Sequence, residues 1–470
     1  MQTSDEKMNR REFAAAGTAL ATASLLGVAA SPGGEVSTRP TLSAGAAEVV
    51  VTPAAEGTFL VGPMKESTGV NDDLYARVAV LSDGSTRLAI VTIDFLGFDF
   101  VFNDLLIAAI ARSTGIPADH VMINCSHTHS APITVPWGPW AKAKDQTYHK
   151  FLPERLAKAA RQACDRLKPV QLTYGREPAQ IGFNRRTLHD DRVVMAPNPS
   201  GAVVPWIDVL SMDSLDGERV AALFSYAAHP VIVHNTSRLI SADYPGFAVK
   251  NLRQSHDGET VFMFAQGCSG NVNAFPLQGG MEAATAAGRD LGRAVKRALD
   301  NGGAEANGSL KALSCELTLP LADPPPMAEL EEIIAGIEDA PKRGRREALL
   351  AIAKSDRPQT MPFPIRAFAV GEELCILGLP HEPFAEYHHF VERISPFEHT
   401  MVFGYTNGLH CYVGTEKDYL LGERGGYETS PWGAALMFES RLPLAPSCEK
   451  LIQAGIRRTL QTLKAKSVNS

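Results

Sequence analysis

Short strand-like runs alternate with helix-like segments along most of the chain, and this alternation restricts the folds that it can adopt. The residues at 77–94 (RVAVLSDGSTRLAIVTID) read as two strands joined by Asp83-Gly84, a pair typical of hairpin turns. The residues at 103–115 follow with apolar side chains at helical spacing and a terminal glycine, and HVMINCS (120–126) is then another strand. We therefore predict an α/β fold, formed by a single large domain with layered mixed β-sheets flanked by helices.

The same alternation continues toward the C-terminus. Further strands are predicted at 47–53, 206–214, 219–230 and 261–267, with a hairpin of two strands at 366–380. Further helices are predicted at 147–167, 281–300, 327–354 and 445–466, and the residues at 301–326 are predicted to form loops. Because α/β proteins commonly place their chemistry where strands open into loops, we expect an active site at the strand ends.

Length and charge exclude several classes of protein. A chain of 470 residues suits one large domain or two ordinary ones. Its net charge of −7 and the lack of a basic cluster argue against a nucleic-acid surface. The seven cysteines include no CxxC pair, so neither a disulfide framework nor a cysteine zinc site is predicted.

The first residues differ from the rest of the chain. MNRREF (8–13), with its pair Arg10-Arg11, precedes a run of small and apolar residues, and this pattern is typical of a secretory signal of the twin-arginine type. A membrane anchor is disfavoured because spanning requires about 20 strongly apolar residues. We predict a signal peptide at 1–30, a linker at 31–45 and one domain at 46–470, in a protein that is exported and periplasmic or secreted.

Polar residues with metal-binding side chains stand at four predicted strand ends. They are His127 and His129, His229, Glu382 and Tyr412. Imidazole and carboxylate ligands suit zinc, and a catalytic zinc site keeps one position open. Two histidines at i and i+2 point in opposite directions from a regular strand, so if His127 binds a metal, His129 is better placed to transfer a proton. Each histidine alone also fits a hydrogen-bonded structural role, and the spacing leaves this open.

Several motifs resemble one known family. They occur in the order SHTHSAP (126–132), AAHPVIVHNTSRLISADYPG (227–246), FAQGCSGNVNAF (264–275), LGLPHEPFAE (377–386), YTNGLHCYVGTEKDY (405–419) and GGYE (425–428). Together with AEVVVTP (47–53) and FNRR (183–186), they resemble the catalytic domain of the neutral/alkaline, non-lysosomal ceramidases. The resemblance runs from about residue 43 to 465, and the C-terminal immunoglobulin-like domain of the long ceramidases has no counterpart.

The resemblance implies a mechanism and the residues that perform it. One Zn2+ per chain would be bound by His127, His229, Glu382 and Tyr412. His129 would be the general acid/base, and Arg185 and Tyr427 would hold the scissile carbonyl. The implied function is hydrolysis of N-acyl sphingosine-type lipids to fatty acid and amine by zinc-bound hydroxide, while zinc, arginine and tyrosine stabilise the oxyanion.

Two positions depart from the family pattern. Asn273 stands where the family has a serine near the substrate, and His381 stands where it usually has glycine. Zinc-bound hydroxide needs no serine nucleophile, so the amidase mechanism is retained, whereas the substrate is left open. The alternatives are another N-acyl amine, an ester or an acylated sugar cleaved in the same way, or a ceramidase-like binding protein without catalysis.

The remaining candidates are assigned ordinary roles. QGCSG (266–270) lacks the GxSxG spacing of a nucleophile elbow, so Cys268 and Ser269 are predicted to lie in a glycine-rich loop beside the metal. His388 and His389 are predicted on a solvated helix face, and His234 either supports the site or lies in a loop. The expected partner is a lipid or small-molecule amide, with transient contact to a membrane surface and no nucleic acid.

Overall fold

The computed structural model describes residues 41–135, 147–256, 259–355, 359–431, 433 and 441–468. The predicted signal peptide at 1–30 lies outside the described residues, so the division of the chain at residues 30 and 45 stays a prediction. The first strand includes the last residues of the predicted linker, because β1 (Ser43–Val50) begins before residue 46. Within the described part, no helix combines the length and apolar character needed to cross a membrane.

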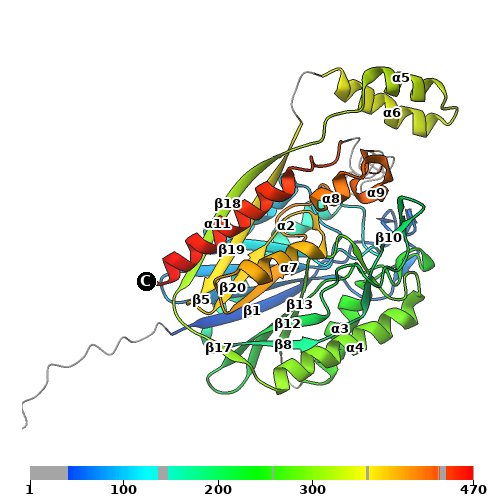
Figure 1. The fold of residues 1–470 in the computed structure, drawn as a ribbon. Coiled ribbons are helices and arrows are strands. Elements are labelled where there is room, and N and C mark those ends of the chain that lie inside the picture. The colour runs from blue at the N-terminus through cyan, green and yellow to red at the C-terminus, as the bar shows by residue number, and fades with distance from the viewer. Residues whose placement is uncertain are drawn as a thin grey trace, which may run out of the picture. The chain divides into compact units, whose positions relative to one another are not determined.

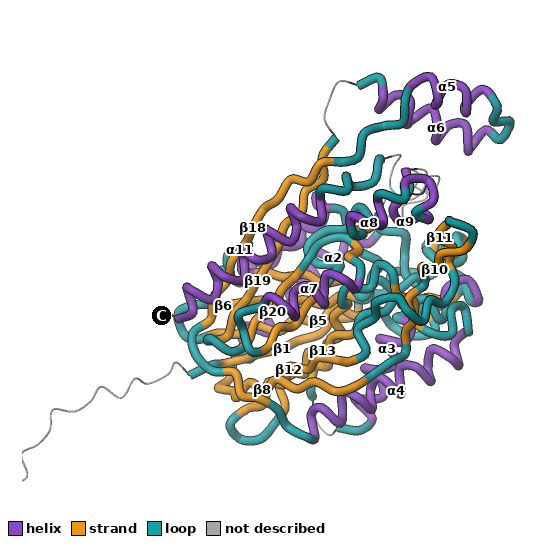
Figure 2. Tube along the Cα trace, viewed as in Figure 1, coloured by secondary structure: helices purple, strands orange, loops and turns teal. Residues whose placement is uncertain are grey.

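A mixed nine-stranded sheet forms the largest layer (Figures 1 and 2). It contains β1, β5 (Tyr75–Ser82), β6 (Arg87–Ile93), β7 (Val121–Cys125), β8 (Lys168–Pro178), β12 (Trp206–Ser214), β13 (Arg219–Tyr226), β15 (Val261–Gln266) and β17 (Ala304–Ala306). The order is β15-β13-β12-β8-β1-β5-β6-β7, with β17 beside β8, and the pairs β6–β7 and β13–β15 are parallel. The predicted hairpin at 77–94 is confirmed by β5 and β6, which are joined through Gly84 at a φ of 89°.

A second, four-stranded sheet packs on one face of the first. It contains β18 (Leu310–Pro320), β19 (Thr360–Val370), β20 (Leu374–Gly378) and β22 (His399–Phe403), in that order, with β20 and β22 parallel. Apolar side chains of both sheets form one buried cluster between them, including Leu210, Leu223, Phe368 and Ile376. The two sheets therefore share a core that neither could bury alone.

Helices cover the outer faces of both sheets. The nine-stranded sheet is covered by α1 (Phe100–Thr114), α2 (Tyr148–Asp165), α3 (Asp243–Gln254) and α4 (Gly280–Asp300), and the smaller sheet by α7 (Ala385–Ile394) and α11 (Cys448–Val468). Figure 1 shows α11 lying along the strands of the smaller sheet. The ends of α1 follow its sequence: the carboxylate of Asp99 accepts the backbone N–H of Phe102, and Gly115 adopts a φ of 73°. The predicted layered α/β architecture is confirmed.

Short strand pairs and helices lie around the ends of the long strands. They are β2 (Phe59–Leu60), β3 (Lys65–Glu66), β4 (Gly69–Val70), β9 (Gly182–Asn184), β10 (Arg186–His189), β11 (Arg192–Met195), β14 (Leu239–Ile240), β16 (Val272–Ala274), β21 (Glu382–Pro383), β23 (Tyr412–Val413), α8 (Glu416–Tyr419) and α9 (Gly426–Thr429). Three of these pairs matter for the site: β9 with β16, β10 with β11, and β21 with β23.

Three sequence-based predictions are wrong. The predicted loop at 301–326 contains β17 and β18, and β18 pairs with β19 along its whole length, from Leu310 opposite Val370 to Pro320 opposite Thr360. This partner is distant in sequence and most side chains of β18 are only partly buried, so the local pattern carried little strand signal. The single helix at 327–354 is two helices, α5 (Met327–Ala335) and α6 (Ala340–Ala353).

The third wrong prediction is the solvated face of α7. His388 is 2% exposed and is packed against the indole of Trp206, with ring centroids 5.6 Å apart. The Nε2 atom of His389 lies 2.9 Å from the carbonyl oxygen of Val203. These two histidines therefore anchor α7 to the body of the domain.

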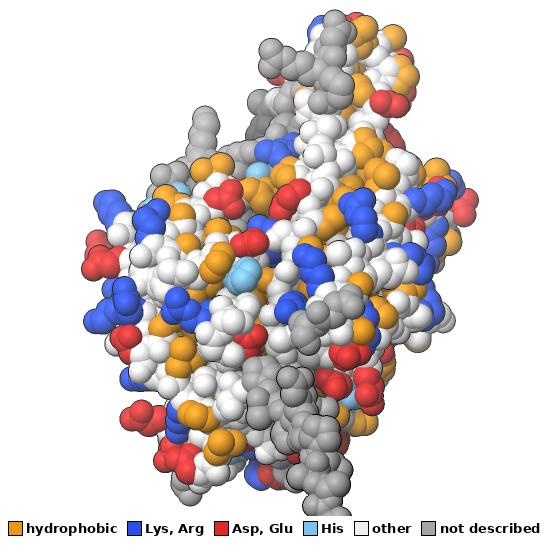
Figure 3. Space-filling view, turned by 90° about the vertical axis from the view of Figure 1, so that its left-hand side faces the viewer, with side chains coloured by type: hydrophobic (Ala, Val, Ile, Leu, Met, Phe, Trp, Pro, Cys, Tyr) orange, Lys and Arg blue, Asp and Glu red, His pale blue; other side chains and the backbone are white. Residues whose placement is uncertain are grey.

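Charges of both signs are mixed on the surface. Figure 3 shows one face of the molecule, on which Lys and Arg side chains alternate with Asp and Glu side chains. The described residues of this face form no extended basic area. This distribution agrees with the net charge of −7 and gives no support to a nucleic-acid partner on this face.

Candidate active site

A buried asparagine brings the ends of three strands together. Asn124 in β7 donates through Nδ2 to the carbonyl oxygens of Gln266, at 3.1 Å, and Gly404, at 2.7 Å. Its Oδ1 accepts the backbone N–H of Gln266 at 2.8 Å. The carboxyl ends of β7, β15 and β22 therefore meet at one point. The segments that follow β7 and β22 carry His127, His129 and Tyr412, whereas His229 and Glu382 follow β13 and β20.

Two histidines and a carboxylate converge at this point. The Nε2 atom of His229 lies 3.0 Å from Oε2 of Glu382, and Nε2 of His127 lies 3.4 Å from the same oxygen. All three side chains are fully buried. His127 has a φ of 68°, an uncommon value for a residue with a side chain, which turns the chain as it leaves β7. We call His127, His229 and Glu382 the metal cluster.

The other ring nitrogens of the two histidines bind backbone carbonyls. His127 Nδ1 lies 2.6 Å from the carbonyl oxygen of Leu96, and His229 Nδ1 lies 2.8 Å from that of Ser269. A carbonyl oxygen can only accept, so each Nδ1 donates a proton, and in the neutral imidazole each Nε2 then carries a lone pair. Both Nε2 atoms face the carboxylate of Glu382. Among the described residues, His127 Nε2 and Glu382 Oε1 have no hydrogen-bond partner.

This set of atoms fits a divalent cation. Buried acceptors that face one another are unfavourable unless a positive charge lies between them, and histidines that bind metals usually donate their other N–H to a carbonyl or carboxylate. Burial alone would raise the pKa of Glu382, but the neighbouring His127 and His229 outweigh it and lower the pKa to about 2. Burial, with the nearby positive charge of Arg185, lowers the pKa of His229 to about 3. The carboxylate is therefore ionised and His229 neutral, as metal ligands must be.

Tyr412 is held next to the metal cluster by strand pairing. β21 and β23 are parallel, with Glu382 opposite Tyr412. The rings of Tyr412 and His229 are 6.4 Å apart between centroids. Burial raises the pKa of Tyr412 well above its usual value. All four residues that the resemblance names as zinc ligands are therefore brought together in space; their role as ligands stays a prediction.

His129 lies beside the metal cluster in a different orientation. Its ring centroid is 5.1 Å from that of His127 and 5.8 Å from that of His229. The ligand atoms of these three histidines lie within 4.8 Å of one another, so geometry alone would also allow His129 to bind the ion. Burial, and then the neighbouring His127, lower the pKa of His129 well below its usual value. On its other side the ring stacks on His234, with centroids 5.3 Å apart.

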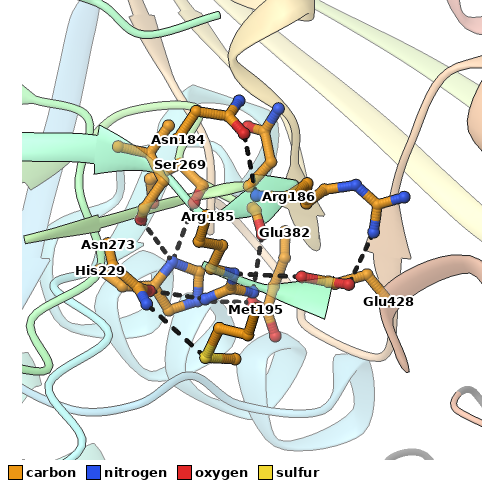
Figure 4. A network of polar contacts seen from close by, with 12 residues as sticks. Asn184, Arg185, Arg186, Met195, His229, Ser269, Asn273, Glu382 and Glu428 are labelled. Atoms are coloured by element: carbon orange, nitrogen blue, oxygen red, sulfur yellow. Dashed lines mark hydrogen bonds and ion pairs between the residues drawn. The ribbon is translucent and has the colours of Figure 1, made fainter. Parts of the chain in front are cut away.

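Arg185 and Arg186 belong to a buried ion-pair network with Glu428, which Figure 4 shows between them. The Nε of Arg185 lies 3.1 Å from Oε1 of Glu428, and Nη1 of Arg186 lies 2.6 Å from Oε2. Arg186 also binds Asp418, at 3.3 Å. We call these four residues the arginine cluster. Arg185 is 2% exposed, so its ion pair with Glu428 is buried.

Two further contacts orient Arg185. Its Nη2 donates to the carbonyl oxygen of Gly270 at 2.8 Å, and its Nη1 donates to Oδ1 of Asn273 at 2.8 Å. Glycine is needed at 270 because a Cβ there would lie 2.3 Å from the carbonyl oxygen of Glu382. The guanidinium carbon lies 5.5 Å from the ring centroid of Tyr412 and 5.4 Å from that of Tyr427. Arg185 and Tyr427 are therefore neighbours, as the predicted carbonyl-binding pair requires.

The residues that depart from the family pattern have clear contacts. Asn273 holds Arg185, and its Nδ2 lies 4.0 Å from the sulfur of Met195 (Figure 4). His381 is fully buried, with Nε2 2.9 Å from the carbonyl oxygen of Pro362 and Nδ1 accepting the backbone N–H of His410. Both ring nitrogens of His381 are thus used within the protein.

Ser269 has a structural position in the glycine-rich loop. Its hydroxyl is buried and bonds to the hydroxyl of Tyr405 at 3.0 Å and to Nε2 of Gln266 at 2.9 Å. Burial raises the pKa of the neighbouring Cys268 thiol, which disfavours a thiolate nucleophile. The reading of QGCSG as a loop beside the metal cluster agrees with these contacts.

Three buried residues of this region were not identified from the sequence. Asn124 joins the strand ends, Glu428 joins the two arginines, and Tyr405 packs its ring 4.5 Å from that of His127. Only Glu428 had a local signal, because it follows Tyr427 directly. The other two are distinguished only by contacts to residues more than a hundred positions away.

Comparisons with known proteins support the predicted resemblance. No family model matches the chain. The neutral ceramidase of Pseudomonas aeruginosa is 24% identical over 242 residues, which are 49% of this chain and 36% of that protein. The chain thus matches about a third of the length of this curated relative.

Solved structures of ceramidases share the fold. The crystal structure of the Pseudomonas aeruginosa neutral ceramidase matches with a TM-score of 0.71 and 19% identity, over 91% of this chain and 75% of that chain. A structure described as ceramidase complexed with C2 matches with a TM-score of 0.70 and 18% identity, over 91% of this chain and 76% of that chain. The predicted resemblance to the neutral ceramidase family is thereby confirmed, in fold over 91% of the chain and in sequence over 49% of it.

Proposed function

We propose that the chain is a metal-dependent hydrolase that cleaves the amide bond of N-acyl sphingosine-type lipids. The observation that carries this proposal is the metal cluster, in which two buried imidazoles face a buried carboxylate, and in which His127 Nε2 and Glu382 Oε1 have no hydrogen-bond partner among the described residues. The presence of Arg185 and Tyr427 beside it adds donors for a carbonyl oxygen. The likeness to ceramidases selects the amide of a lipid among the bonds that such a site could cleave.

We propose that His127, His229, Glu382 and Tyr412 hold one zinc ion. A zinc ion at such a site lowers the pKa of a bound water from about 15.7 to about 7 and polarises a carbonyl oxygen. His229 and His127 are already fixed in the ligating tautomer by the carbonyl oxygens of Ser269 and Leu96. The protein thus needs little rearrangement to bind the ion.

The remaining residues act on the substrate. Arg185 is immobilised by three partners and donates to the carbonyl oxygen as negative charge develops there, together with Tyr427. His129, beside the cluster, takes up a proton from the attacking water and passes it to the departing amine nitrogen, and its lowered pKa keeps the ring neutral and able to accept that proton. Amines leave poorly without this proton. The division gives each predicted site residue a separate task.

A paired assay on the purified mature chain tests this proposal. We would measure the zinc content and, in parallel, hydrolysis of a fluorescent N-acyl sphingosine and of a short N-acyl amine. One zinc with release of sphingosine supports a ceramidase. One zinc with cleavage of the short amide alone keeps the mechanism and assigns another substrate, and a chain without zinc contradicts the proposal.

Export is a separate proposal that rests on residues 1–30 alone. A twin-arginine substrate crosses the membrane folded, which suits an enzyme that receives its metal before export. Fractionation of cells that express the chain with Arg10 and Arg11 intact, or both replaced by Lys, tests it. Activity that remains inside the cell in both cases contradicts export by this route.

A further inference from the structure

An apolar cavity lies beside the arginine cluster, and we propose that it binds the acyl chain of the substrate. This inference rests on the proposed function, because it assigns a place to the hydrocarbon part of an N-acyl lipid. It selects a long-chain amide over the short N-acyl amines and acylated sugars that the sequence left open. The argument depends on the lining of the cavity and on its continuity with the site.

The cavity is lined mainly by apolar side chains, with Gln180 and Asp290 as the polar ones among the described residues. It has a volume of about 580 Å³, which lies within the usual range of ligand sites of about 300–1,000 Å³. Its walls include Ile181, Phe183, Phe275 and Pro276 on one side and the first turns of α4 on the other. Asp290 is the one charged residue among the described residues of the lining. A hydrocarbon chain is therefore the ligand that this lining favours.

Small side chains of α4 leave the space open. Ala283, Ala286 and Ala287 line the cavity at the helical spacing of one face. Larger apolar residues at these positions would fill the space between α4 and the phenylalanines. The volume thus depends on three alanines that α4 presents at this position.

The apolar wall continues directly from the residues that hold Arg185. In the β9–β16 pair, Phe183 is directly opposite Asn273, so both side chains lie on the same face of the two strands. Asn273 binds Arg185 at 2.8 Å, and the ring of Phe183 contacts that of Phe275 with centroids 5.9 Å apart. A chain attached to a carbonyl held at Arg185 therefore meets Phe183 next and Phe275 after it.

The other face of the same strands is used by the core. Val272 and Ala274 are buried and pack with the side chains of the nine-stranded sheet. Phe275, by contrast, is 62% exposed, an unusual state for a large aromatic side chain next to a cavity. An acyl chain that covers this ring would remove apolar surface from water on both partners, which favours binding. The acyl chain is thus the ligand that we propose to cover the exposed ring of Phe275.

Filling the cavity tests the proposal. In Ala286→Phe the added ring occupies the volume, and the matched control is Thr285→Phe, which adds the same ring at an exposed neighbour outside the lining. We would measure kcat/KM for N-acetyl, N-hexanoyl and N-dodecanoyl sphingosine with all three proteins. In the unmodified chain and in Thr285→Phe, kcat/KM should rise by a factor of about four for each methylene group buried.

In Ala286→Phe this rise should stop at a shorter chain, and the N-acetyl substrate should be affected least. An unaltered dependence on chain length would overturn the proposal. The opposite variant Phe275→Ala removes one wall and should lower kcat/KM for the N-dodecanoyl substrate alone. Equal losses for all three substrates would indicate a general structural effect and contradict the assignment.

A binding assay separates this inference from the proposed function. Displacement of a fluorescent fatty acid by dodecanoate is measured on the metal-free proteins, which needs no catalysis. Binding by the unmodified chain and by Thr285→Phe, but not by Ala286→Phe, supports the cavity even if no amide is cleaved. Cleavage of lipid amides together with equal dodecanoate binding by all three proteins contradicts the cavity and leaves the proposed function standing.

Discussion

The metal cluster and the arginine cluster are both buried and charged, yet their hydrogen-bonding differs completely. In the metal cluster, His127 Nε2 and Glu382 Oε1 have no partner among the described residues. In the arginine cluster, each oxygen of Glu428 accepts from one arginine, and Arg185 has three different partners. The described residues supply the hydrogen-bond partners of the arginine cluster, but none for His127 Nε2 and Glu382 Oε1 of the metal cluster.

This difference indicates which of the two clusters needs a ligand or an ion that the chain itself does not supply. A buried charge is costly unless it is paired and hydrogen-bonded. The arginine cluster meets that condition without a ligand, so it can hold its donors ready for a substrate. The metal cluster leaves His127 Nε2 and Glu382 Oε1 without a hydrogen-bond partner among the described residues, and a bound cation would supply one. Five predictions test the contrast, from the largest effect to the smallest.

Replacing a residue of the metal cluster should have the largest effect. His229→Ala removes an Nε2 ligand, so we expect loss of zinc and a fall in the rate of hydrolysis of more than about 100-fold. Mutation of a residue that only supports a metal ligand already lowers metal affinity or activity by about 10–100-fold. Metal analysis and a rate measurement check it. His389→Ala, a histidine bound to Val203 away from the cluster, is the matched control and should keep its zinc. A His229→Ala protein with a full complement of zinc would contradict the ligand assignment.

Removing His129 should leave the metal in place. We expect His129→Ala to retain one zinc and to lose activity by about 100- to 10,000-fold, the usual contribution of general acid–base catalysis. Metal analysis of the same preparation used for kinetics checks it. Loss of zinc would instead place His129 among the ligands with His127 and His229, an arrangement that their distances allow.

Changes in the arginine cluster should affect catalysis without affecting metal content. Arg185→Met should lower kcat by about 100- to 1,000-fold, the usual cost of one donor to a developing oxyanion. Zinc should stay bound, and Glu428 keeps Arg186 as a partner. Steady-state kinetics and metal analysis check this. A rise in KM with unchanged kcat would show that Arg185 only binds the substrate.

Glu428 should act through Arg185. Glu428→Gln should lower kcat about tenfold, since one charge-assisted hydrogen bond to a guanidinium is weakened. The same substitution in the Arg185→Met background should cause no further loss, and additive losses would contradict this coupling. Asp418→Asn is the control, because Asp418 contacts Arg186 but not Arg185. It should lower the melting temperature and leave kcat unchanged.

Without bound metal, lowering the pH should reduce the free energy of unfolding of the chain, and this reduction is smallest near neutral pH. The pKa of His229 is 6.5 before folding and about 3 after it, so between these values only the unfolded chain gains a proton. The free energy of unfolding therefore falls as the pH falls from 6.5 to 3.

The pKa of Glu382 falls from 4.5 to about 2 on folding, because the effect of the neighbouring His127 and His229 exceeds that of burial. Its contribution to stability is present above pH 4.5 and is lost as the pH falls toward 2. Urea unfolding midpoints of the metal-free chain, measured from neutral pH to pH 3, check both. Glu382→Gln should show a shallower fall below pH 4.5, and identical curves would contradict the role of this carboxylate.

The elements that carry the site were largely predictable because their signals are local. The strand before His127, the strand before His229 and the hairpin before Glu382 were each recognised by runs of apolar residues that end in polar ones. The observed strands β7, β13 and β20 end within four residues of these side chains. β18 escaped recognition, because its strand character depends on pairing with β19 and its side chains are mostly half-buried.

Contacts between distant segments could not be predicted in this way. Arg186 directly follows the predicted site residue Arg185, and its buried guanidinium binds Asp418 and Glu428. His381 stands where the family usually has glycine, and it uses both ring nitrogens on the backbone of Pro362 and His410. In each case the partner lies elsewhere in the sequence, so only packing reveals it.

The sequence by itself determined the class of fold, the strand ends that bear imidazole and carboxylate groups, and the resemblance to ceramidases. These follow from periodicity and from ordered motifs, which are properties of short segments. Only the tertiary structure decided that the Nε2 atoms of His127 and His229 both face Glu382, and that Asn273 joins Arg185 to the wall of an apolar cavity. The reason is physical: the protonation state, burial and pairing of a side chain are set by atoms brought next to it from remote parts of the chain.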